Sequence, residues 1–237
     1  MQAFLNDAKV QSKFLLRVQE HAVADEIVQG KYWEGGKGCA VGCTIHGSDH
    51  SKYETQLGIP RELAYLQDAI FEALPAAEAK KFPAQFLEAI PLGADLSRVW
   101  DKFHVWLLLD EKDGLVAIPD MREDCKGWIR DIAVLYTCSA SGTKLTRQQE
   151  EVAEKSARDA RDAWDAWTAW AARAARDAWA ARDAWAAWAA RAAWAAWAPR
   201  DARGAWDARD ARDARDASDA RIKRQLAHLL NLLREPQ

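Results

Sequence analysis

One short segment near the N-terminus gathers the residue types that can do chemistry. Residues 35–50 contain two of the four cysteines and two of the five histidines. They are Cys39, Cys43, His46 and His50. Their spacing, C-x3-C-x2-H-x3-H, puts all four on one face of a helix. At a rise of ~1.5 Å per residue the outer pair would lie roughly 16 Å apart, too far to share one ion. A zinc site is therefore expected only for a subset of these residues, joined by others such as His21 or Cys125.

The same segment can also be interpreted as a nucleophile with its base. The pair Gly38-Cys39 at a predicted helix start places the thiol near backbone N–H groups, which lowers the pKa of a thiol. Under this interpretation Cys39 or Cys43 is the nucleophile. The base is then His46, His50 or His21, with Asp25, Asp49 or Glu54 orienting it.

Two further interpretations use the glycines. The run Gly35-Gly36-Lys37-Gly38 offers flexible N–H donors and one cation, so Lys37 and Gly38 are candidates for binding an anionic ligand or cofactor. The order of residues is not that of a Walker A loop. In the fourth interpretation no ligand binds: the cysteines are buried as small apolar residues, and Gly38 and Gly42 allow close packing of two helices. The residues alone leave all four interpretations open.

The elements that must position this segment are predicted to be helices, so the expected fold class is all-α. Pro residues stand near the first turn of several apolar-periodic segments. Predicted helices cover about 3–28, 61–74, 76–81, 84–90, 96–110 and 121–138. Strand-like alternation is scarce. Residues 1–145 are therefore expected to form one helical globular domain.

Residues 156–221 form a tandem repeat of 22 triplets, x-Ala-(Arg or Trp), in which the third position is Arg 12 times and Trp nine times. Ala and Arg favour helix, so residues 146–221 are predicted to be a helical tail. Three residues turn a helix by about 300°, so the tryptophans are spread around its circumference and self-association is expected. Pro199 is the expected site of a kink or a hairpin between helices at about 147–197 and 200–234.

Both ends of the tail carry their own signals. Thr146 and Gln149 have the spacing of a capping box, which predicts a helix start at about 147. At the other end, the helix of residues 222–237 carries an apolar seam with 4-3-4 spacing that is expected to pack on another part of the protein. The seam consists of Ile222, Leu226, Leu229 and Leu233.

Charge and hydropathy exclude some classes of function. Acids outnumber bases by 36 to 33, and Asp nearly balances Arg within the repeat, so there is no strong nucleic-acid signal. No run of 18 uncharged apolar residues predicts a transmembrane segment. The first ten residues lack an apolar signal core, so a cytoplasmic location is expected.

Four blocks of the N-terminal half resemble an uncharacterised family known from bacterial, phage and prophage sequences, whose members end in Ala-rich repeat tails of variable length. The blocks are residues 37–46 (KGCAVGCTIH), 57–60 (LGIP), 70–75 (IFEALP) and 86–91 (FLEAIP). The resemblance covers residues 10–105. It implies a shared helical domain and a mobile-element context, without a particular reaction.

Together these features favour a binding or regulatory protein, with a helical head and a tail that acts as a spacer or binds a protein partner or a second copy. The alternative is a small enzyme or metal protein that uses Cys39, Cys43, His46 and His50.

Overall fold

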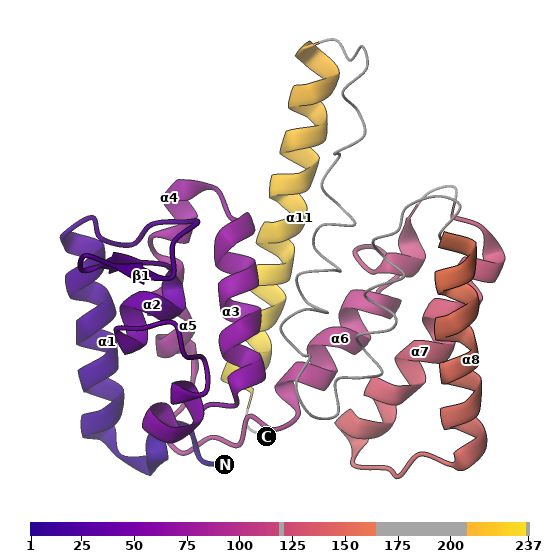
Figure 1. Ribbon diagram of the computed structural model, residues 1–237, viewed down its shortest axis with the longest axis horizontal. Coiled ribbons are helices and arrows are strands. Elements are labelled where there is room, and N and C mark those ends of the chain that lie inside the picture. The colour runs from indigo at the N-terminus through magenta and orange to yellow at the C-terminus, as the bar shows by residue number, and fades with distance from the viewer. Residues whose placement is uncertain (119–120, 165–207, 236–237) are drawn as a thin grey trace. The chain divides into compact units, whose positions relative to one another are not determined.

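The computed structural model describes residues 1–118, 121–164 and 208–235 (Figure 1). The fold is all-α, as predicted, and within these residues the strands are limited to one short hairpin. The chain divides into two compact units, residues 1–100 with 222–237, and residues 101–221. The change in composition near residue 146 therefore lies inside the second unit.

The first unit is built from short helices around a two-stranded hairpin. In chain order they are a 3-10 turn (Ala3–Asn6), α1 (Ala8–Val23), β1 (Trp33–Glu34), β2 (Lys37–Gly38), α2 (Ala40–Ile45), a π-helical turn (Tyr53–Leu57), α3 (Arg61–Ala73), α4 (Ala76–Ala79) and α5 (Phe82–Ala89). Helix α1 is shorter at both ends than predicted. Asp7 caps its start by accepting the N–H of Lys9 at 2.8 Å. Just beyond its end, Asp25 takes a left-handed conformation, with φ of 54°.

The glycine run forms the turn of this hairpin and does not begin a helix. Gly35 and Gly36 have φ of +59° and +83°, as a two-residue type I′ turn requires. Lys37 lies exposed on β2, and the N–H of Gly38 donates to the Glu26 carbonyl at 3.0 Å. The N–H of Gly38 is therefore already used within the backbone, contrary to the expectation that it lies open to an anion.

Helices α1, α2, α3 and α5 pack together around the core of the first unit. Phe14, Leu66, Ile70 and Phe86 are all buried there.

The helix at the C-terminus, α11 (Ala208–Arg234), returns the end of the chain to this unit. Ile222, Leu229 and Leu233 of its apolar seam are buried, and Lys223 pairs with Glu78 of α4 at 2.7 Å. The seam packs as predicted, and the repeat is consequently anchored beyond its last triplet.

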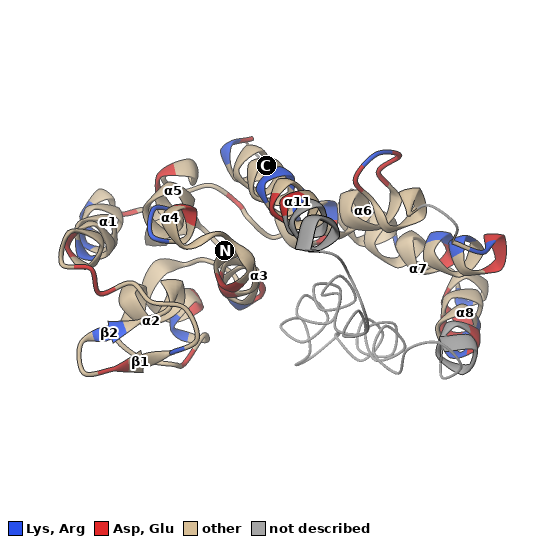
Figure 2. Ribbon diagram, turned by 90° about the horizontal axis from the view of Figure 1, so that it is seen from above, with Lys and Arg blue, Asp and Glu red and all other residues tan. Residues whose placement is uncertain are grey.

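The second unit contains the start of the repeat. Its elements are α6 (Val99–Leu109) from residue 101 on, a 3-10 turn (Leu115–Ala117), α7 (Glu123–Ser141), α8 (Arg147–Trp164) and α11 up to residue 221, and α7 packs along α8. The predicted capping box is present, because the Gln149 N–H donates to Thr146 Oγ1 at 3.2 Å and the Thr146 N–H donates to Gln149 Oε1 at 2.9 Å. Figure 2 shows acidic and basic residues side by side on α8, where Arg158 pairs with Glu154 at 2.6 Å.

Helix α8 turns small side chains toward its neighbour. Ala153, Ser156 and Ala157 are buried, and Ser156 Oγ donates to Asp131 Oδ2 of α7 at 2.5 Å. The expected kink or hairpin at Pro199 lies outside the described residues. Among the helices that the structure describes, none is long and apolar enough to cross a membrane.

Candidate functional site

Three polar side chains of the first unit form a continuous chain of hydrogen bonds. Glu26 Oε2 lies 2.6 Å from His21 Nδ1, and His21 Nε2 lies 2.8 Å from His46 Nε2. The side chain of His21 is 12% exposed and that of Glu26 32%, while His46 is the exposed end. The chain therefore runs from a partly exposed carboxylate through a mostly buried imidazole to an imidazole at the surface.

Local backbone features bring these residues together. His21 lies in the last turn of α1, and the turn at Asp25 reverses the chain so that Glu26 comes back beside it. His46 follows the last residue of α2 in a left-handed conformation, with φ of 51° and ψ of 56°, as is common for a helix C-cap. Arg17, one turn before His21 on α1, donates to the carbonyl of Thr44 at 2.8 Å and so ties α1 to the end of α2.

The segment of residues 31–33 lies over α2 and contributes Trp33, which forms the aromatic wall of the site. The Trp33 ring stacks on His46, with 4.6 Å between centroids and 13° between planes. The Cys39 N–H donates to the carbonyls of Lys31, at 2.6 Å, and Tyr32, at 3.2 Å. The backbone of this segment can lie so close to α2 because α2 carries a glycine, Gly42, at the point of contact.

A Cβ atom on Gly38 or Gly42 would lie 2.2 Å or 1.6 Å from the Tyr32 carbonyl oxygen. The two glycines thus have the packing role that the fourth interpretation gave them. The element that they admit is an extended segment and not a second helix.

The hydrogen bonds fix the position of each proton when both rings are neutral. An ionised Glu26 accepts from His21 Nδ1–H, which leaves His21 Nε2 as an acceptor. His46 must then donate from Nε2, and its Nδ1 carries a lone pair. Among the described residues none forms a hydrogen bond with His46 Nδ1, so the outer end of the chain is a base at the surface.

The surroundings of His46 keep this base neutral. Partial burial lowers the pKa of His46 below its ordinary value of 6.5, and the positive charge of Arg17 and the neighbouring His21 lower it further, against the opposing effect of Glu26. The ring is therefore unprotonated at neutral pH, as a general base must be.

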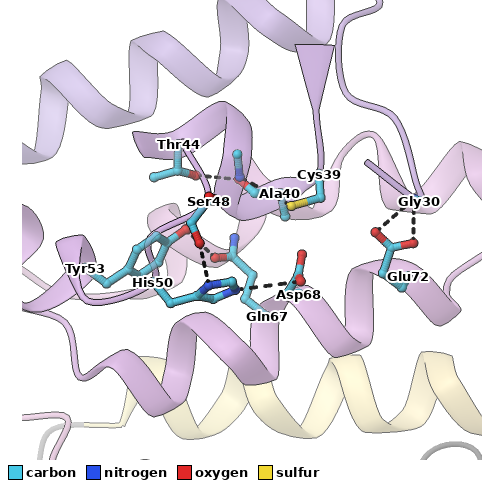
Figure 3. Close-up of polar contacts among 11 residues, drawn as sticks. Gly30, Cys39, Ala40, Thr44, Ser48, His50, Tyr53, Gln67, Asp68 and Glu72 are labelled. Carbon is cyan, nitrogen blue, oxygen red and sulfur yellow. Dashed lines mark hydrogen bonds and ion pairs between the residues drawn. The ribbon is translucent and has the colours of Figure 1, made fainter. Parts of the chain in front are cut away.

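The two cysteines of the segment are buried thiols. Cys39 is the N-cap of α2, and its sulfur accepts the Gly42 N–H at 3.4 Å (Figure 3). Burial, together with the carboxylate of Asp68, raises the pKa of Cys39 far above its ordinary value, and burial raises the pKa of Cys43 to about 12. Both are protonated at neutral pH, so the position at the helix start does not produce a thiolate.

His50 belongs to a second cluster, which is buried. Its Nδ1 lies 3.1 Å from the Ser48 carbonyl oxygen and its Nε2 lies 3.7 Å from Asp68 Oδ2 (Figure 3). Its ring stacks on Tyr65, with 4.2 Å between the ring centroids. The candidate ligands therefore separate into a hydrogen-bonded pair, His21 with His46, and buried groups around Cys39, Cys43 and His50. No set of three or more His, Cys, Asp or Glu side chains that could hold a metal ion occurs within the described ranges.

The sequence signalled part of this site. It singled out His46 and His21, but Glu26 and Trp33 received no role. A helix predicted to continue to residue 28 would have placed Glu26 five residues after His21, away from the same face. The pair Ala24-Asp25 carries no strong stop signal, so the turn that brings Glu26 back depends on tertiary packing.

Comparison of the chain with protein-family models, with curated proteins and with solved structures yields no match.

Proposed function

We propose that the first unit is a small enzyme in which His46 acts as a general base, and that His21 and Glu26 position it and stabilise its protonated form. The observation that supports this proposal is the unbroken chain from Glu26 through His21 to the exposed His46, with contacts of 2.6 and 2.8 Å. The proposal develops the enzyme alternative of the sequence analysis, with the histidine in place of a cysteine as the reactive group.

The chain gives the proton a defined route. A water molecule or substrate hydroxyl loses its proton to His46 Nδ1 as its oxygen bonds to the carbonyl carbon or phosphorus of an activated ester. The bond to the leaving group then breaks, and the leaving group departs as its anion. The proton on His46 Nε2 can then move to His21 Nε2, which transfers the positive charge to the ring that donates to Glu26. An imidazolium beside a carboxylate is more stable than an isolated one, so the relay lowers the energy of the charged intermediate.

The reaction class is therefore hydrolysis or group transfer from an activated ester. General base catalysis by a positioned side chain typically contributes about 10²- to 10⁴-fold to a rate. Trp33, stacked on one face of His46, limits the approach of substrate to the other face and edge of the ring. A planar leaving group would be able to stack on the same aromatic wall.

Hydrolysis of p-nitrophenyl acetate by the full chain tests the proposal. His46→Gln should remove the part of the rate above background, and Glu26→Gln should reduce that part while leaving the protein folded. Glu34→Gln is the matched control, because Glu34 lies 77% exposed in the adjacent hairpin and has no contact with the relay. A His46→Gln protein with the unchanged rate would rule out the proposed function.

A second candidate function is assembly through the repeat, as the composition of the tail suggests. It is supported by the anchoring of both flanks, since α8 packs on α7 and the end of α11 packs in the first unit. The repeat is thus joined at each end to a packed helix, and we propose that its nine tryptophans bind a protein partner or a second copy.

Sedimentation equilibrium of the full chain tests this candidate. The comparison is a variant in which the nine repeat tryptophans are replaced by alanine, the residue most common in the repeat. The variant should be monomeric where the natural chain associates. Equal mass for both proteins would exclude assembly through these indoles.

A further inference from the structure

The buried cluster around His50 contains three polar atoms that the relay does not use. They are His50 Nε2, Asp68 Oδ1 and Gln67 Nε2, and none has a hydrogen-bond partner. The three residues are 7%, 9% and 0% exposed. A buried polar atom without a hydrogen-bond partner destabilises the fold, so three such atoms close together indicate a binding site for a small ligand.

Gln67 and Asp68 come from α3 and His50 from the loop after α2, and the three side chains lie beside one another. Figure 3 shows Gln67 and Asp68 rising from α3 toward α2, with the His50 ring beside them. His50 Nε2 and Asp68 Oδ2 are 3.7 Å apart, beyond a direct hydrogen bond. Asp68 also lies close enough to Cys39 to raise the pKa of that thiol.

Neighbouring contacts hold these groups in place and prevent them from satisfying each other. Gln67 Oε1 accepts from the Tyr53 hydroxyl at 2.6 Å, which directs the amide nitrogen away from Tyr53. The His50 ring is fixed by the Ser48 carbonyl on Nδ1 and by stacking on Tyr65. Its Nε2 therefore cannot turn to another partner without breaking both contacts.

The hydrogen-bond donors and acceptors of these three residues determine which ligand the site can bind. Gln67 Nε2 is a donor and requires an acceptor, whereas the Asp68 carboxylate requires a donor. A metal ion or an ammonium group cannot accept from Gln67. A halide or a carboxylate cannot donate to Asp68 and would be repelled by its charge. A hydroxyl group does both.

We infer that Gln67, Asp68 and His50 form a buried binding site for a single hydroxyl group, supplied by a water molecule or by a small alcohol. The hydroxyl oxygen accepts from Gln67 Nε2, and its hydrogen is donated to Asp68 Oδ1. In a neutral His50 ring Nδ1–H donates to the Ser48 carbonyl, so Nε2 is an acceptor that the second hydrogen of a water fills and that an alcohol leaves unused. Three hydrogen bonds are the usual number for a buried water, and they would link α3 to the loop that follows α2.

Magnetic relaxation dispersion of the solvent oxygen nucleus, measured on the full chain, detects a water of long residence at such a site. Gln67→Met removes the donor at similar volume and should abolish that signal. Gln56→Met is the matched control, because Gln56 is an exposed glutamine of the neighbouring π-helical turn. Titration with ethanol separates the two sources of the hydroxyl: a displaced water signal identifies alcohol as a ligand, and an unchanged signal identifies water as the guest.

A high-resolution crystal structure of the natural chain provides an independent test that does not depend on the variant folding. The proposal expects one density peak within hydrogen-bond distance of Gln67 Nε2, Asp68 Oδ1 and His50 Nε2. The absence of a long-lived water, or a structure in which these three atoms bond directly to one another, would overturn it.

Discussion

Substitution of Gly42 by alanine tests how the segment of residues 31–33 is seated on α2. The added Cβ would lie 1.6 Å from the Tyr32 carbonyl oxygen and 2.8 Å from its carbonyl carbon, whereas real Cβ contacts essentially never fall under 3.0 Å. The clash is with backbone, which cannot rotate away. The segment must therefore move by more than an ångström, and the hydrogen bonds from Cys39 N–H to Lys31 and Tyr32 are lost or weakened.

The expected change in the free energy of unfolding is the balance of destabilising and stabilising effects of the substitution. Overpacking costs about 1–3 kcal/mol, and each weakened hydrogen bond costs about 1 kcal/mol. Alanine gains roughly 0.5–1 kcal/mol over glycine within a helix. The free energy of unfolding should fall by about 2–4 kcal/mol. Gly127→Ala in α7 is the matched control, because its Cβ would meet nothing within 4 Å, and it should raise stability by about 0.5–1 kcal/mol.

Urea unfolding of the two variants and the natural chain, followed by far-ultraviolet circular dichroism, measures both effects. The Gly42→Ala protein should also lose esterase activity, because Trp33 moves away from His46 together with Tyr32. If Gly42→Ala is as stable as Gly127→Ala, the close approach of the Tyr32 carbonyl to α2 is not present in solution, and the reasoning about this motif fails.

Three further predictions concern other parts of the molecule. The folded protein holds the pKa of His46 below its unfolded value of 6.5, so the unfolded chain binds more protons in acid. His46 should therefore leave the free energy of unfolding unaffected above pH 6.5 and lower it as the pH drops below that value. His46→Gln should reduce this fall, as measured by urea titrations at several pH values. Leu233→Ala should cost about 2–5 kcal/mol in thermal unfolding, clearly more than Leu226→Ala, since Leu233 is fully buried and Leu226 is partly exposed; equal losses would show that the seam is not packed. Thr146→Ala should cost about 1 kcal/mol in the same assay through loss of the helix cap, and an unchanged midpoint would mean that the capping box is not formed.

Helix periodicity and capping signals predicted much of the fold. The all-α class, the start of α8 after Thr146 and the buried seam of α11 all follow from local patterns that tertiary packing reinforces.

The hairpin of residues 33–38 was missed because its strands are two residues long, which leaves no alternation to detect. In retrospect Gly35-Gly36 is its only local signal, and the same pair also suits a loop before a helix.

The candidate site was predictable in its residue types and unpredictable in its pairings. Cys39 and Cys43 were reasonable nucleophiles on sequence alone, because the effect of a helix start on a thiol is local. The opposing effects of burial and of Asp68 come from α3, about thirty residues further along the chain, and no spacing rule reveals them. Glu26 becomes the partner of His21 through one turn at Asp25, and His21 meets His46 because α1 packs on α2.

The pH dependence of p-nitrophenyl acetate hydrolysis tests the central claim most directly. For the natural chain the rate above background should rise with the fraction of unprotonated His46, reach half its plateau below pH 6.5, and stay level above it. The Glu34→Gln control should follow the same curve, and His46→Gln should show no such transition. A natural chain and a His46→Gln protein with superimposable profiles would contradict the assignment of His46 as the base.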